Sequence, residues 1–166
     1  MIGSFPYHNL SRKVKPRMTM VDITQKPEVY REATARGIIK LRPETIRRIR
    51  EGKIEKGDPF EIARIAGILA AKNTSGLIPL CHPLPITNVK VEIGIENEEL
   101  VSVTTTVKTK AQTGVEMEAL VGTAVALLTI WDMTKAYEKD SEGQYPFTAI
   151  KEIKVLRKLK EESKNE

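Results

Sequence analysis

A single long helix is the feature that most constrains the fold of this 166-residue chain. The residues from Thr113 to Tyr137 are predicted to form it, and apolar side chains occur almost all the way round, which is typical of a buried helix. Its apolar centre, Ala119 to Trp131, has 13 residues and contains Gly122 and two threonines. Because a membrane span needs about 20 apolar residues, we expect a core helix and no membrane association.

A β-hairpin precedes the long helix. Residues 86–96 and 100–110 each alternate apolar and polar side chains, the pattern of half-buried strands, and a short polar turn joins them. The other predicted elements are strands at 36–41 and 147–156 and helices at 44–50 and 59–72. Together these elements predict an α+β fold, an antiparallel sheet with helices packed on one face.

The helix at 59–72 has clear boundaries. Asp58 is a good N-cap, and Pro59 is tolerated in the first turn. Helical spacing predicts a buried face made of Ile62, Ile65, Ala66, Leu69 and Ala70. The following segment, 77–85, contains three prolines and is predicted to be an extended apolar loop that presents Cys81 and His82.

The charge distribution argues against nucleic acid as a partner. The net charge is +5, but residues 18–150 hold 17 basic and 18 acidic side chains, so the excess lies in the two ends. Cys81 is the only cysteine, which excludes an intramolecular disulfide, and an apolar signal segment is absent, so we expect a cytoplasmic protein. The expected organisation is a flexible extension (1–17), one catalytic domain (18–158) and a charged tail (159–166).

Two carboxylates stand near the start of the long helix. Glu116 lies three residues after Thr113, so the two form either a capping box or part of a site, and the sequence does not favour one over the other. Glu118 directly precedes the apolar run, where a carboxylate needs a partner or has a raised pKa. Glu118 is therefore a candidate site residue.

An aspartate and a lysine stand near the end of the same helix. Asp132 and Lys135 are three residues apart and share one face. They are either a surface ion pair or, given their apolar neighbours, a partly desolvated pair in which the pKa of Lys135 is lowered enough for acid–base catalysis. Lys56 beside Gly57 is either a solvated loop lysine or an anion contact, and His82 is either a proton carrier or a structural histidine.

These candidates cannot all serve one small site in one chain. Glu118 and Asp132 are 14 residues apart, or about 21 Å along the helix axis. Either the substrate is extended, or each site takes Glu118 from one subunit and Lys135 from another. We expect the second arrangement, a homo-oligomer with interfacial sites.

Signatures of several other classes are absent. The chain has no phosphate-binding glycine loop, CxxC or HExxH, and Cys81 with His82 supplies at most two metal ligands, so no protein-bound metal is expected. A nucleotide-binding regulatory module is one alternative, although anion binding alone gains nothing from Asp132, Glu116 and Glu118. An RNA-binding ferredoxin-like domain is another, but paired aromatic residues are missing from the hairpin.

Six motifs stand between Met20 and Leu156: Met20-Val21-Asp22-Ile23, Lys56-Gly57-Asp58, Ala63-Arg64-Ile65-Ala66-Gly67, Leu77-Ile78-Pro79-Leu80-Cys81-His82-Pro83-Leu84, Thr113-Gly114-Val115-Glu116-Met117-Glu118-Ala119-Leu120 and Asp132-Met133-Thr134-Lys135-Ala136. They resemble the molybdenum cofactor biosynthesis protein C family, the cyclic pyranopterin monophosphate synthases. The two longest are specific and occur in the family's order.

The resemblance implies a ferredoxin-like fold, a hexamer built from three dimers, and sites at the dimer interface. The implied substrate is a cyclised dihydro-GTP, converted to cyclic pyranopterin monophosphate with release of pyrophosphate. No redox cofactor is implied, and magnesium enters only as a companion of the substrate triphosphate. The implied catalytic residues are Lys56, Asp132 and Lys135, and the implied substrate-binding residues are Leu80, Cys81, His82, Glu116, Met117 and Glu118.

Overall fold

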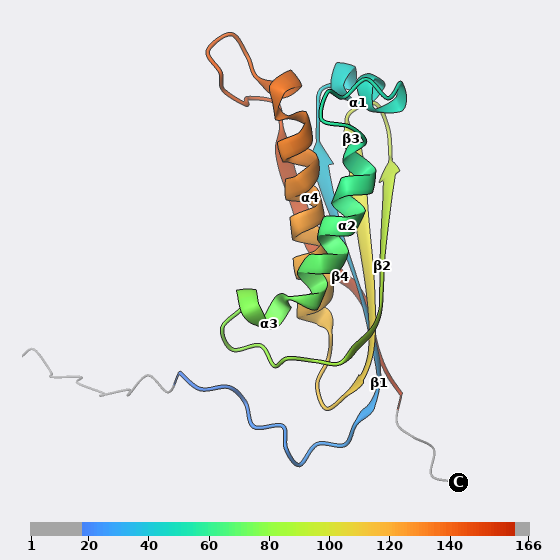
Figure 1. The fold of residues 1–166 in the computed structure, drawn as a ribbon, viewed down its shortest axis with the longest axis vertical. Helices are drawn as coiled ribbons and strands as arrows, with labels where there is room; N and C mark the ends of the chain where they lie inside the picture. The colour runs from blue at the N-terminus through green and yellow to red at the C-terminus, as the bar shows by residue number, and fades with distance from the viewer. Residues whose placement is uncertain (1–17, 162–166) are drawn as a thin grey trace, which may run out of the picture.

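Four strands form one antiparallel sheet in the computed structural model, which describes residues 18–161 (Figure 1). The strands are β1 (Val29–Lys40), β2 (Ile86–Ile95), β3 (Leu100–Ala111) and β4 (Ala149–Glu161). They lie in the order β2-β3-β1-β4, and every neighbouring pair is antiparallel. Alternating apolar residues favour this arrangement because one sheet face is buried and the other is solvated. The predicted hairpin is confirmed.

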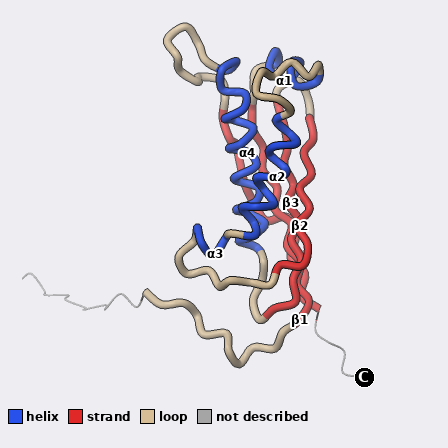
Figure 2. The backbone as a smooth tube through the Cα atoms, viewed as in Figure 1, coloured by secondary structure: helices blue, strands red, loops and turns tan. Residues whose placement is uncertain are grey.

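The helices lie on one face of this sheet. They are α1 (Pro43–Arg50), α2 (Pro59–Lys72), α3 (Thr74–Leu77) and α4 (Glu116–Glu138). The long helices α2 and α4 lie side by side on the sheet, as Figures 1 and 2 both show. The predicted α+β, ferredoxin-like fold is confirmed. Helix α1 and the end of α4 lie at one end of the molecule, and α3 and the start of α4 lie at the other.

The core is made of aliphatic side chains between the sheet and α4. Its fully buried members include Ile39, Val101, Val103, Leu127 and Ile130. By length and composition α4 is apolar enough to cross a membrane, but 56% of its most apolar window is buried inside the protein. The packing therefore supports the expected role as the core helix of a soluble domain.

Of the two alternatives for Thr113 and Glu116, the structure excludes the capping box. Helix α4 begins at Glu116, its N-cap position is occupied by Val115, and no side chain caps it. Thr113 therefore precedes the N-cap position by two residues. In contrast, the predicted cap of α2 is confirmed, because the Asp58 carboxylate accepts hydrogen bonds from the backbone N–H groups of Phe60 and Glu61, at 2.8 and 3.3 Å.

The predicted buried face of α2 is largely wrong. Ile62, Ile65 and Leu69 are 45%, 56% and 58% exposed, whereas the buried positions carry small residues such as Ala63 and Gly67. The cause is the close approach of α2 to α4: a Cβ at Gly67 would lie 3.0 Å from the Gly122 carbonyl oxygen. Only small side chains fit this contact, so the large ones face outward.

Other boundaries also differ from the predictions. Strand β1 starts at Val29 instead of residue 36. Its first half is buried through two alanines, Ala33 and Ala35, and such small side chains give only a weak apolar alternation in the sequence. Strand β4 reaches Glu161, into the segment predicted as a tail. The predicted loop 77–85 starts one residue later, since Leu77 ends the short helix α3. The predicted extension 1–17 lies outside the described residues.

Candidate active site

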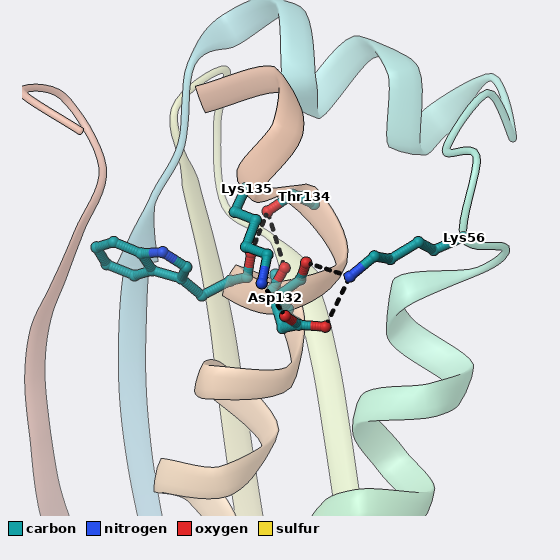
Figure 3. A network of polar contacts seen from close by, with 6 residues as sticks. Lys56, Asp132, Thr134 and Lys135 are labelled. Carbon is teal, nitrogen blue, oxygen red and sulfur yellow. Dashed lines mark hydrogen bonds and ion pairs between the residues drawn. The ribbon is translucent and has the colours of Figure 1, made fainter. Parts of the chain in front are cut away.

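A cluster of two lysines and one aspartate lies near the C-terminal end of α4. The Asp132 carboxylate contacts Lys56 Nζ through Oδ2 at 2.8 Å and Lys135 Nζ through Oδ1 at 2.6 Å (Figure 3). Lys56 Nζ also donates to the Asp132 carbonyl oxygen at 3.0 Å. The structure thus brings together three candidates, although Lys56 is 76 residues from Asp132 in the sequence.

The helix surface explains how these side chains are presented. Ile130, Met133 and Thr134 are buried, and the Thr134 hydroxyl donates to the Ile130 carbonyl oxygen at 2.8 Å. Asp132 and Lys135 occupy the opposite, exposed side of the same turn. Leu128, Trp131 and Ile150 line a shallow hollow of about 420 Å³ together with Asp132 and Lys135. The charged cluster therefore stands beside an open apolar surface.

The electrostatics of this cluster correct one prediction. Hydrogen bonds from Lys135 and then Lys56 lower the pKa of Asp132 to about 2, so the carboxylate is ionised at neutral pH. The hydrogen bond that Lys135 donates to Asp132 raises the pKa of Lys135. The predicted desolvation and lowered pKa of Lys135 are wrong for the single chain, because this lysine side chain is 46% exposed and next to a carboxylate.

A second group of candidates lines a pocket of about 300 Å³ near the start of α4. It includes five residues singled out in the sequence: Leu80, Cys81, His82, Met117 and Glu118. The loop after α3 and the first turn of α4 supply them. The segment before β1 adds Val21, Ile23 and Lys26, which sequence reasoning assigned to no site. Lys26 is the only lysine or arginine among the described lining residues.

Glu118 is the most unusual group in this pocket. It is only 4% exposed, and its Oε2 atom has no hydrogen-bond partner among the described residues. Burial, with a smaller contribution from Glu116, raises the pKa of its carboxyl group. A buried acceptor without a partner is costly, so the pocket is well suited to a ligand that offers N–H or O–H donors.

The neighbouring loop side chains have different properties. Burial, followed by the negative charge of Glu118, raises the pKa of the Cys81 thiol, which disfavours the reactive thiolate form. His82 Nε2 lies 2.8 Å from the Val21 carbonyl oxygen and so links the loop to the N-terminal segment. Cys81 is therefore better suited to packing or ligand contact than to nucleophilic attack.

Glu116 does not line the pocket that contains Cys81 and Glu118, which is called the Glu118 pocket below. It lines a separate hollow with Arg31, Glu32 and Lys158, and Lys158 Nζ is 3.3 Å from its Oε1 atom. Its helix position, two residues before Glu118, turns it toward β4. In the single chain the structure does not bring Glu116 together with the other predicted substrate-binding residues.

The two groups lie at opposite ends of α4 (Figure 1). Fourteen residues separate Glu118 from Asp132, which corresponds to about 21 Å of helix. A side chain cannot cross that distance. Within one chain, the lysine–aspartate cluster and the Glu118 pocket are therefore two separate groups of residues.

We expect Glu118→Gln to raise the thermal stability of the protein near neutral pH. Because the folded-state pKa is above the ordinary 4.5, ionising Glu118 destabilises the folded state as pH rises through that window. Glutamine has no such cost, so its advantage should be full above the raised pKa and should disappear below about pH 4.5. Melting curves across pH check this, with exposed Glu28→Gln as the control. The prediction is contradicted if the gain in melting temperature over the wild type is no larger at pH 7 than at pH 4.

The comparisons with known proteins agree with the resemblance. The MoaC family model matches residues 20–160. A Pyrococcus furiosus protein named "Probable cyclic pyranopterin monophosphate synthase" is 57% identical over 143 residues, which cover 86% of this chain and 91% of that protein. A Sulfurisphaera tokodaii protein of the same name is 59% identical over 141 residues, 85% of this chain and 93% of that protein. This chain is therefore an enzyme, a lyase, and it belongs to the MoaC family.

Proposed function

We propose that this enzyme converts 3',8-cyclo-7,8-dihydro-GTP to cyclic pyranopterin monophosphate, with release of pyrophosphate, in molybdenum cofactor biosynthesis. The observation that carries the proposal is the contact of Lys56 and Lys135 with one carboxylate, Asp132, in a chain of this family. Opening the imidazole ring, closing the pyran ring and forming the cyclic phosphate all require proton transfers. Two amines that share one aspartate are suited to such transfers.

The free chain favours proton donation from this cluster. Asp132 is ionised at neutral pH, and its hydrogen bond stabilises the charged form of Lys135. A positively charged amine can bind the triphosphate and donate a proton to a leaving nitrogen or oxygen. After donating its proton, the neutral amine can accept one from the substrate in a later step. Lys56 and Lys135 would thus be general acid and base catalysts, held in place by Asp132.

The Glu118 pocket supports recognition of the base-derived ring. A guanine-derived pyrimidine ring carries an amino group and a ring N–H, both donors. The unpartnered Glu118 oxygen supplies a buried acceptor for such donors. Leu80 and Met117 supply apolar contact area for the ring, with Cys81 and His82 beside them. Lys26 at the edge of this pocket carries the positive charge that a phosphate group needs.

A second copy of the chain would bring the two groups together. Ile62, Ile65 and Leu69 form an exposed apolar stripe along α2, and Leu128 on α4 is 57% exposed. If the two-fold axis is perpendicular to the paired helices, they run antiparallel, and the start of one α4 then lies near the end of the other. Each complete site would then combine Glu118 of one chain with Lys135 of its neighbour. We propose a homo-oligomer of this kind, a hexamer of three dimers.

The chemistry needs no redox cofactor, because the reaction changes no overall oxidation state. Among residues 18–161 there is no group of three His, Cys, Asp or Glu side chains arranged to hold a metal ion. We propose that magnesium, where present, is carried by the substrate triphosphate instead of by protein ligands. The proposed location is the cytoplasm.

The direct test is to supply the purified protein with 3',8-cyclo-7,8-dihydro-GTP and to measure pyrophosphate together with the pterin product. The proposal expects both to form in equal amounts. A nucleotide-binding module without catalytic activity would bind the compound and release no pyrophosphate, which would overturn the proposed function. GTP as substrate is the matched control, since it lacks the cyclised ring system and should release none.

A further inference from the structure

The loop between α1 and α2 carries Lys56 and is attached to α4 by hydrogen bonds. Its backbone turns tightly, with the Gly57 N–H donating to the Ile54 carbonyl oxygen at 3.0 Å and Gly57 at a φ of +97°. Ile54 is buried, but Glu55, Lys56 and Gly57 are exposed. The Glu55 N–H donates to the Tyr137 hydroxyl oxygen at 2.9 Å. This bond connects the residue next to Lys56 directly to α4.

Tyr137 is itself held in place. Its ring is half-buried, and the Arg48 guanidinium of α1 lies 5.0 Å from the ring centroid. Arg48 is in turn paired with Glu44 at 3.0 Å. The hydroxyl that receives the Glu55 N–H is therefore the end of a fixed side chain, and its position is set by two packed helices.

The same helix presents both parts of the contact. Tyr137 follows Asp132 by five residues, a rise of about 7.5 Å along α4. Asp132 accepts hydrogen bonds from the Lys56 amine (Figure 3). Tyr137 accepts one from the backbone N–H of Glu55, the residue beside Lys56. A lysine side chain is long and flexible, so the position of its amine depends on where its backbone is fixed. Two attachments to one rigid helix reduce the conformations open to Lys56.

We propose that Tyr137 is a positioning residue for Lys56, acting through its hydrogen bond to the Glu55 N–H. This inference rests on the proposed function, in which Lys56 is catalytic. Tyr137 does not need to touch substrate for this role. Without the bond, the exposed turn around Lys56 samples more conformations, and the amine spends less time at Asp132.

The variant Tyr137→Phe tests this, because it keeps the ring under Arg48 and removes only the hydroxyl. We expect kcat to fall by roughly tenfold, the loss typical of one hydrogen bond, with KM nearly unchanged. Hydrogen exchange of the Glu55 amide should become faster by a similar factor. The melting temperature should stay close to that of the wild type.

Tyr30→Phe is the matched control, because it also removes one hydroxyl, which bonds Glu32 at 2.8 Å on the sheet. It should leave kcat and the Glu55 amide unchanged. An unchanged kcat in an active Tyr137→Phe enzyme, or an unchanged Glu55 amide, would overturn the proposal. The exchange measurement needs no turnover, so it tests the Tyr137 bond even if the wild type releases no pyrophosphate, a result that would overturn the proposed function.

Discussion

Asp132→Asn should lower kcat/KM by about 10²- to 10³-fold, the range for losing a general acid–base group, while the protein stays folded. Asparagine has nearly the same shape as aspartate but no charge. It forms no ion pair, and it keeps only one acceptor oxygen for the two amines, those of Lys56 and Lys135, that the carboxylate holds at 2.8 and 2.6 Å. Both lysines would then be poorly placed at once, and the effect should exceed that of removing a single contact.

The stability of the protein should hardly change in this variant. All three side chains are about half exposed, and exposed ion pairs contribute little to the free energy of unfolding. Pyrophosphate release and a melting curve separate the two effects. Glu92→Gln is the control, since Glu92 forms an exposed ion pair with Lys90 at 2.7 Å on β2, away from the cluster. An Asn variant with more than about a third of wild-type activity would refute the role of Asp132.

Glu138→Ala should destabilise the protein by about 3 kcal/mol, a large effect that arises when a buried hydrogen-bonded group is removed. Glu138 ends α4 and is fully buried. Its two carboxyl oxygens accept the Arg42 N–H at 3.0 and 3.2 Å, and the Thr148 hydroxyl donates to Oε2. The side chain therefore joins the end of α4 to the start of α1 and to the segment before β4.

Alanine in this position removes the acceptor of the part-buried Arg42 N–H and of the buried Thr148 hydroxyl, and it opens a cavity. Chemical denaturation measures the change in the free energy of unfolding. Glu142→Ala provides the comparison, because Glu142 is exposed in the loop that follows α4 and should change stability by less than about 0.5 kcal/mol. A loss below about 1 kcal/mol for Glu138→Ala would show that the buried contacts matter less than their geometry indicates.

The sequence predicts elements well where local patterns decide them. Strict alternation predicts the hairpin, and Asp58 with Pro59 predicts the start of α2, since both signals act within a few residues. The buried face of α2 depends instead on the distance to α4, which no local pattern contains. Gly67 is buried because it contacts Gly122, and the larger Ile65 and Leu69 face outward for the same reason.

In the candidate site, too, the contact between near residues could be predicted from the sequence and the contact with a distant residue could not. The contact between Asp132 and Lys135 follows from their helical spacing. The contact between Lys56 and Asp132 depends instead on a loop that is far away in the sequence. The resemblance singled out Lys56 as catalytic, whereas residue chemistry alone left it either a solvated loop lysine or an anion contact. Apolar neighbours in the sequence led to the wrong prediction of a desolvated Lys135, because Ile130 and Met133 point into the core from the other side of the helix.

Mixing two inactive variants tests the proposal that each site combines Glu118 of one chain with Lys135 of another. Glu118→Ala and Lys135→Ala should each release little pyrophosphate alone. When the two chains are co-expressed and assemble at random, about a quarter of the shared sites contain neither substitution, so about a quarter of wild-type activity should return. Activity that stays at the level of the separate variants would contradict the shared site and would place each complete site within one chain.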